Sequence, residues 1–71
     1  MPLDWKPLKT VGRGVCEIRV HTRVEHRVIY VARLEEAVYV LHVFEKRTRN
    51  TPKSAINVAQ RRLAELLRRR K

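Results

Sequence analysis

The chain has 71 residues, of which 44% are hydrophobic, and its 17 Lys and Arg against 7 Asp and Glu give a formal net charge of +10. A chain of this length forms a single domain (1–71) that buries only about 60% of its unfolded surface. Its one cysteine excludes an intrachain disulfide framework, and no apolar stretch approaches the roughly 20 residues of a membrane-spanning helix. The first residues lack the layout of a signal peptide. These features predict a cytoplasmic, strongly cationic domain with no membrane segment.

The charge is concentrated in the second part of the chain. Residues 1–44 carry 7 basic and 5 acidic side chains, net +2, whereas residues 45–71 carry 10 basic and 2 acidic ones, net +8. A coat of charge that serves only solubility would be more even, so the pattern favours a polyanionic partner. Nucleic acid is the partner that the composition favours, and an acidic protein or an anionic membrane surface is the alternative.

Residues 1–44 predict an irregular lead-in followed by a sheet. The lead-in, 1–13, contains two prolines and no sustained period, and it ends in a glycine-rich turn. The sheet occupies 14–44. Its first strand, 15–21, alternates: Cys16, Ile18 and Val20 share one face, and the polar residues between them share the other. This is the pattern of a half-buried strand with a charged face, in which Cys16 is a small core residue.

Two more strands and a helix complete the predicted α+β fold. Residues 26–33 are rich in β-branched side chains, and 37–44 are apolar on both faces, which is typical of a central strand. Short polar links favour a three-stranded antiparallel meander. A basic loop, 45–50, leads to an amphipathic C-terminal helix, 51–69, with Thr51 as its N-cap and Pro52 at its first position.

One helix covers only part of one sheet face. An apolar strand would then stay exposed unless the lead-in or another chain covers it, and large exposed apolar patches are rare on stable monomers. We therefore expect a homo-oligomer through the exposed sheet, or a tight protein partner.

Basic side chains are the main candidates for a functional site. In a meander, Arg19 and Arg27 lie on neighbouring strands, and the loop after the third strand brings Lys46 near them. Guanidinium forks match phosphate oxygens, so a phosphodiester is the expected ligand and a solvated strand face is the alternative. Further RNA contacts are expected from three basic residues of the loop and helix start: Arg47, Arg49 and Lys53.

Histidines and the cysteine raise two other possibilities. His42, near the end of the third strand, has a pKa suited to proton transfer, and a structural role is the alternative. No His or Cys pair has the spacing of a zinc site, and Cys16 and His21 fall on opposite faces of their strand. We expect neither a metal nor a cofactor.

Three segments resemble a family of bacterial toxins. Residues 6–9 (KPLK) with 14–20 (GVCEIRV), residues 26–30 (HRVIY), and residues 39–48 (YVLHVFEKRT) with Thr51-Pro52 carry the likeness. Together they resemble the "KPLK…G…ELR", "YRVxY" and "YVLHxFxKKT…TP" motifs of the HigB-like, phage-derived branch of the RelE/ParE toxin superfamily. The likeness runs from Lys6 to about Leu67.

The resemblance implies a toxin of a type II toxin–antitoxin module. RelE-like toxins are mRNA interferases, endoribonucleases that cleave ribosome-bound mRNA, and an antitoxin, usually a helix-turn-helix protein in this branch, silences them. By this likeness Arg27 contacts the scissile phosphate, Arg19 and Lys46 are basic active-site residues, and His42 is a histidine that the branch keeps. Metal-free cleavage needs fixed cations, supplied by Arg19 and Arg27, and a proton carrier, which is Lys46 or His42.

Two departures from the family pattern favour an alternative. Glu17 stands where RelE proper has a basic residue, and no tyrosine occurs in 51–54. Family members also usually carry another strand and helices before the segment that starts here, so we expect a partial RelE-like fold. The alternative function is a truncated, non-catalytic relative that binds an antitoxin or RNA.

Overall fold

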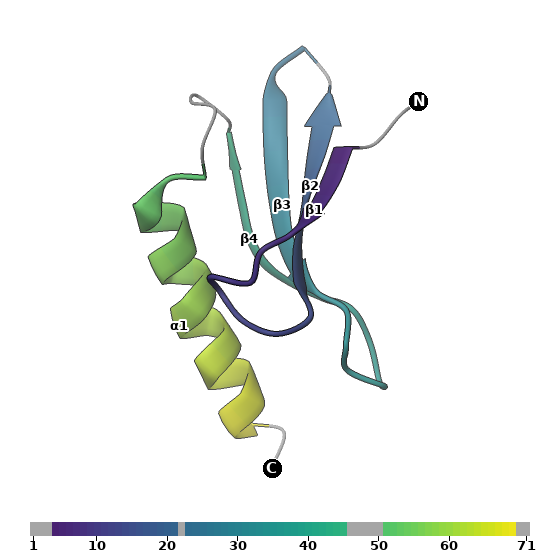
Figure 1. Ribbon diagram of the computed structural model, residues 1–71, viewed down its shortest axis with the longest axis vertical. Helices are drawn as coiled ribbons and strands as arrows, with labels where there is room; N and C mark the ends of the chain where they lie inside the picture. Colours follow the sequence, from purple (N-terminus) through teal and green to yellow (C-terminus); the bar gives the residue numbers. More distant parts are fainter. Residues whose placement is uncertain (1–3, 22, 46–50, 70–71) are drawn as a thin grey trace.

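Four antiparallel strands and one helix make up the protein, as a computed structural model of residues 4–21, 23–45 and 51–69 shows (Figure 1). The sheet order is β1-β2-β3-β4, a simple meander. The elements are β1 (Asp4–Pro7), β2 (Val15–His21), β3 (Glu25–Val31), β4 (Tyr39–Glu45) and α1 (Lys53–Arg69). The α+β class, the antiparallel meander and the C-terminal helix are confirmed.

The predicted number of strands, three, is wrong. Part of the lead-in forms β1, which pairs with β2 so that Trp5 lies opposite Ile18 and Pro7 opposite Cys16. A strand of four residues is too short to show alternation, and it is held by its neighbour rather than by its own pattern. Pro7 is tolerated because β1 is an edge strand, where a missing backbone donor costs little.

The strand predicted to be central, β4, is an edge strand that pairs with β3 alone. Its register with β3 shifts between Ile29, opposite His42, and Tyr30, opposite Val40. The bulge leaves Leu41 between these pairs, and its side chain is buried in the core. The second apolar face of β4, which suggested a central strand, consists of Val40 and Val43, and both valines are exposed on the sheet face opposite α1.

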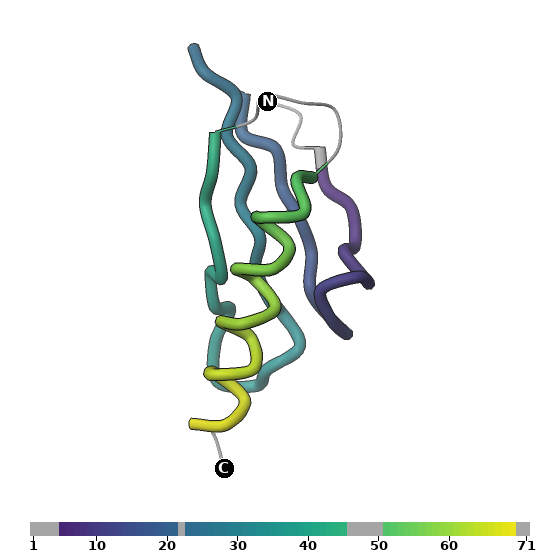
Figure 2. The backbone as a smooth tube through the Cα atoms, turned by 90° about the vertical axis from the view of Figure 1, so that its left-hand side faces the viewer, coloured from purple at the N-terminus to yellow at the C-terminus, as the bar shows by residue number. Residues whose placement is uncertain are grey.

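The helix covers the sheet face opposite to the one that the alternation of 15–21 suggested. Figure 2 shows α1 crossing one face of the sheet, and the core lies between them. On β2 the residues that face the core are Val15 and Glu17, whereas Cys16 and Ile18 point to the other face. The charged face of this strand is thus the covered one, and Cys16 is only half-buried. The core consists of Leu8, Val11, Val15, Ile29, Val31, Leu41, Ala59 and Leu63.

The turn after β1 packs on α1 and fixes the position of the helix. Gln60 donates from Nε2 to the carbonyl oxygen of Thr10 at 2.7 Å. A Cβ atom at Gly12 would lie 2.7 Å from Cδ2 of Leu63, so a larger residue here would displace the end of that side chain. Gly14 has φ +75°, which favours glycine in the turn into β2.

The helix begins at Lys53, one residue after the expected first position, Pro52. The Ile56 N–H donates to the Pro52 carbonyl oxygen at 3.1 Å, so Pro52 is the cap residue and not the first helical one. Thr51 points its hydroxyl at the sheet instead. In the part of the chain that the structure describes, no helix has the length and hydropathy needed to cross a bilayer.

Candidate functional site

A buried ion pair joins β2 and β3 beneath the start of α1. The side chains of Glu17 and Arg27 are fully enclosed, with 1% and 0% of each residue exposed. Arg27 Nη1 lies 3.4 Å from Glu17 Oε2 and 3.5 Å from Oε1. Charged groups persist in a core only when they are paired, so each residue explains the burial of the other.

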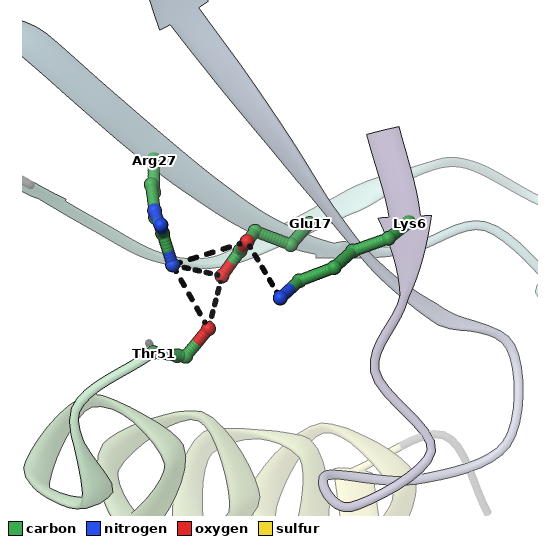
Figure 3. A network of polar contacts seen from close by, with 4 residues as sticks. All are labelled: Lys6, Glu17, Arg27 and Thr51. Atoms are coloured by element: carbon green, nitrogen blue, oxygen red, sulfur yellow. Dashed lines mark hydrogen bonds and ion pairs between the residues drawn. The ribbon is translucent and has the colours of Figure 1, made fainter. Parts of the chain in front are cut away.

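Two further side chains complete this cluster (Figure 3). The Thr51 hydroxyl donates to Glu17 Oε1 at 2.5 Å and accepts from Arg27 Nη1 at 3.2 Å. Lys6 on β1 reaches the same carboxylate, with Nζ 3.7 Å from Oε2, and its side chain is 45% exposed. The cluster therefore bonds Thr51, two residues before α1, to β2 and β3, and Lys6 connects β1 to the same carboxylate.

Arg19 lies next to the cluster. It is paired with Arg27 across β2 and β3, and Arg27 is paired in turn with Phe44 of β4. Arg19 is half-buried and lines a shallow hollow of about 200 Å³ with Trp5, Lys6 and Glu17. The predicted proximity of Arg19 and Arg27 is thus observed, but Arg19 is the one that reaches solvent.

A second polar arrangement connects β4 with α1. Arg62 donates from Nη1 to the Leu41 carbonyl oxygen at 2.8 Å, and the same atom lies 3.5 Å from His42 Nδ1. The His42 ring stacks on Phe44, with centroids 5.3 Å apart and planes at 18°. The guanidinium is therefore fixed beside a half-buried imidazole.

The surroundings of His42 keep its imidazole neutral. Burial lowers its pKa from 6.5, and the positive charge of Arg62 lowers it further. A histidine with a lowered pKa is neutral at neutral pH, so one of its ring nitrogens carries a lone pair that can accept a proton. This arrangement has the parts of a general base beside a phosphate-binding cation.

Sequence reasoning missed Arg62. Helical periodicity placed it on the polar side of the helix, and it contacts β4 only because α1 crosses that strand. The contact joins residues 20 positions apart, and no local spacing indicates it. The bulge at Leu41 is part of the same site, since it places this carbonyl group within reach of the guanidinium.

The other predicted site residues are distributed as follows. His42 lies on the covered face one row from Arg27, opposite Ile29, and β3 separates it from Glu17 and Arg19 on β2. Lys53 is exposed at the first position of α1. Three of the predicted residues lie outside the described part of the chain: Lys46, Arg47 and Arg49.

The comparison with protein families gives a match to the phage-derived Gp49-like family (DUF891) over residues 1–64. The matched segment spans nearly the whole chain. The protein belongs to the phage-derived Gp49-like family. This family stands in the toxin–antitoxin context, and membership is consistent with a toxin of such a module. No curated protein and no solved structure matches the chain.

The described part of this Gp49-like protein has ten exposed basic residues, five of them on β1 or in the connections between strands and the other five on α1. Those on α1 are Lys53, Arg61, Arg62, Arg68 and Arg69. The described residues contain no group of three His, Cys, Asp or Glu side chains that could hold a metal ion. At His42 the structure places one fixed cation, Arg62, beside a neutral imidazole.

Proposed function

We propose that this Gp49-like protein is the toxin of a type II toxin–antitoxin module and acts as a metal-free endoribonuclease on ribosome-bound mRNA. The observation that carries the proposal is the neutral imidazole of His42 beside the guanidinium of Arg62, in a protein of net charge +10. RNA supplies its own nucleophile, so a base, an acid and fixed positive charge are the groups that its cleavage requires.

The proposed reaction is an internal transfer at phosphorus. The 2′-oxygen attacks the adjacent phosphorus, the bond to the 5′-oxygen breaks, and a 2′,3′-cyclic phosphate and a 5′-hydroxyl are formed. His42 takes the proton from the 2′-hydroxyl, and Lys46 gives a proton to the leaving 5′-oxygen. Arg62 and Arg19 stabilise the negative charge that develops on the phosphate oxygens.

Arg27 supports this site from inside the protein. Its guanidinium is enclosed by Glu17 and Thr51, so in this proposal it positions the sheet and the helix start, and the half-buried Arg19 takes the phosphate. Lys53, together with Arg47 and Arg49, binds the RNA backbone away from the bond that is cleaved.

The proposed partners are mRNA on the ribosome and a cognate antitoxin of the helix-turn-helix class, in the cytoplasm. The antitoxin follows from the family context. A strongly cationic toxin favours an antitoxin segment with negative charge, because opposite potentials speed and orient association.

A second candidate is a non-catalytic relative that binds RNA or an antitoxin. The burial of Arg27 against Glu17 favours it, because the guanidinium that the resemblance assigns to the scissile phosphate is neutralised inside the fold. The two candidates differ in whether RNA is cut.

Induced expression in bacterial cells, with mapping of mRNA ends, tests the proposal. We expect growth arrest and cleaved mRNA ending in 2′,3′-cyclic phosphates. His42→Ala lowers the cleavage rate about 10²–10⁴-fold because it removes the base, and Arg62→Gln lowers it about 10²–10³-fold. The matched controls are His26→Ala, on the other face of the sheet, and Arg61→Gln, the exposed neighbour on α1.

The wild-type protein decides between the two candidates. Unimpaired growth and intact mRNA, with soluble protein that still binds RNA or antitoxin, would establish the non-catalytic relative. If the His42→Ala variant still cleaves mRNA, the protein is a nuclease but His42 is not its general base.

A further inference from the structure

The sheet face opposite α1 is apolar across its full width. Residues paired in register share a face, so Trp5, Ile18, Val28 and Val43 form one row across all four strands. Tyr30 and Val40 belong to the next row. We name this surface the open face, defined by these six residues. In the described part of the chain no helix or strand covers it (Figures 1 and 2).

Three of its six side chains are exposed to an extent that is unusual for large apolar residues, and the other three are half-buried. Trp5 is 61% exposed, Val40 60% and Val43 53%. Burial raises the pKa of Tyr30, and the neighbouring Cys16 thiol raises it further. A contiguous patch of this kind marks an interaction surface.

The open face is also neutral, although the protein is strongly basic. Its two rows, as the strand pairing defines them, contain no Lys or Arg among the described residues. Basic side chains instead lie on α1, as Lys53 does, beside the buried cluster, as Lys6 does, or in the connections between strands, as Arg23 does. An acidic partner would be drawn to those surfaces and would find no charge to pair with on the open face.

We propose that a second copy of this chain occupies the open face, so that two sheets stack face to face about a two-fold axis. Like charges oppose association of a protein of net charge +10, and the open face is the surface on which two copies approach with the least repulsion. A two-fold arrangement is self-complementary, and sheets packed in this way lie about 10 Å apart around an apolar core.

The arrangement leaves the proposed catalytic site accessible. α1 and His42 lie on the covered face of each sheet, so in the dimer both helices and both His42–Arg62 pairs point outward. The dimer proposal does not depend on the ribonuclease proposal, because it concerns the opposite face.

The size of the face sets the strength of the dimer. Three strands of seven residues and β1 of four, at about 3.4 Å per residue and about 4.8 Å between strands, give a face of roughly 400 Å² per copy, or roughly 800 Å² in total. This lies at the lower end of specific interfaces, so we expect a weak dimer with a Kd on the order of micromolar or above.

Sedimentation across roughly micromolar to millimolar concentrations tests the proposal. We expect a monomer–dimer equilibrium, and a blue shift of tryptophan emission with rising concentration, because Trp5 is the one tryptophan and lies on the open face. Val43→Lys weakens the dimer at least about tenfold by placing a charge in the interface. Val24→Lys, at an exposed valine outside the open face, is the matched control and dimerises like the wild type.

A milder variant covers the case in which Val43→Lys fails to fold. Val40→Thr with Val43→Thr keeps β-branched side chains and weakens the dimer through lost apolar contact. A protein that stays monomeric throughout, or assembles beyond a dimer, overturns the proposal. A dimer that neither variant weakens also overturns the proposal. The same holds if the wild type is monomeric and the open-face variants lose binding to the antitoxin.

Discussion

Arg27 and Glu17 show how a charged pair can serve as part of a small core. Their charges cancel at 3.4 Å, and Thr51 bridges them, so the helix start is bonded to the sheet at a buried point. Removing one of the two side chains leaves the other as a buried charge without its counterion. This costs far more free energy than removing both. The pair is therefore a determinant of stability.

Single and double substitutions of this pair have opposite expected effects. Arg27→Leu or Glu17→Leu alone lowers the free energy of unfolding by about 3–5 kcal/mol, which is most of the stability of a domain this small. The double variant recovers most of the loss, because Lys6 returns to solvent and no buried charge remains. Urea unfolding followed by circular dichroism measures both. Glu35→Gln, at an exposed acidic residue, is the control and leaves the midpoint unchanged. Single variants as stable as the wild type would contradict this account.

His42 makes stability depend on pH with a definite sign. Its pKa is lower in the folded protein than the ordinary 6.5, so the unfolded chain binds the proton first on acidification. The contribution of His42 is therefore fully present above pH 6.5 and is lost as the pH falls toward its folded pKa. His42→Asn removes this part of the pH dependence.

NMR titration of the ring protons measures the same quantity directly. The His42 resonance titrates below 6.5, and Arg62→Gln moves it part of the way back, because burial remains while the neighbouring charge is gone. Arg61→Gln leaves it in place. A midpoint at or above 6.5 in the wild type would remove the reason to regard His42 as a neutral base.

At the scale of the elements, local pattern predicted β2, β3, β4 and α1 well, because each has a clear period. β1 was not predicted because four residues that end in Pro7 show no alternation of apolar and polar side chains. The prediction that β4 is the central strand was wrong. An apolar pattern on both faces of a strand shows that neither face favours water, but it does not show what covers each face.

Which face of β2 is buried could not be read from its residue types. Alternation separates Glu17 from Cys16 and Ile18, but the covered face is decided by pairing between strands and by where α1 lies. Glu17 is enclosed because Arg27 neutralises it across the sheet. For the same reason the proximity of Arg19 and Arg27 was predictable from a meander, whereas the burial of Arg27 and the contact of Arg62 with His42 were not.

At the scale of the whole molecule, charge is segregated by face. The open face is neutral, and the helix side carries exposed cations along α1. This separation lets one small sheet serve two purposes, because apolar association and polyanion binding use opposite faces. The stability that 71 residues can supply is small, so burying the open face in a dimer would also stabilise the fold.

Salt dependence tests the electrostatic half of this division. Binding of a short single-stranded RNA weakens as salt rises, because each neutralised phosphate releases condensed counterions, with a slope of about −0.7 per contact in a plot of log affinity against log salt. Lys53→Gln and Arg68→Gln each reduce that slope by about one contact, because both side chains are exposed on α1. The charge-neutral Val40→Thr leaves the slope unchanged while it weakens the proposed dimer. Fluorescence anisotropy between about 50 and 200 mM salt measures the slopes, and an affinity that does not change with salt would assign the cations of α1 to a protein partner.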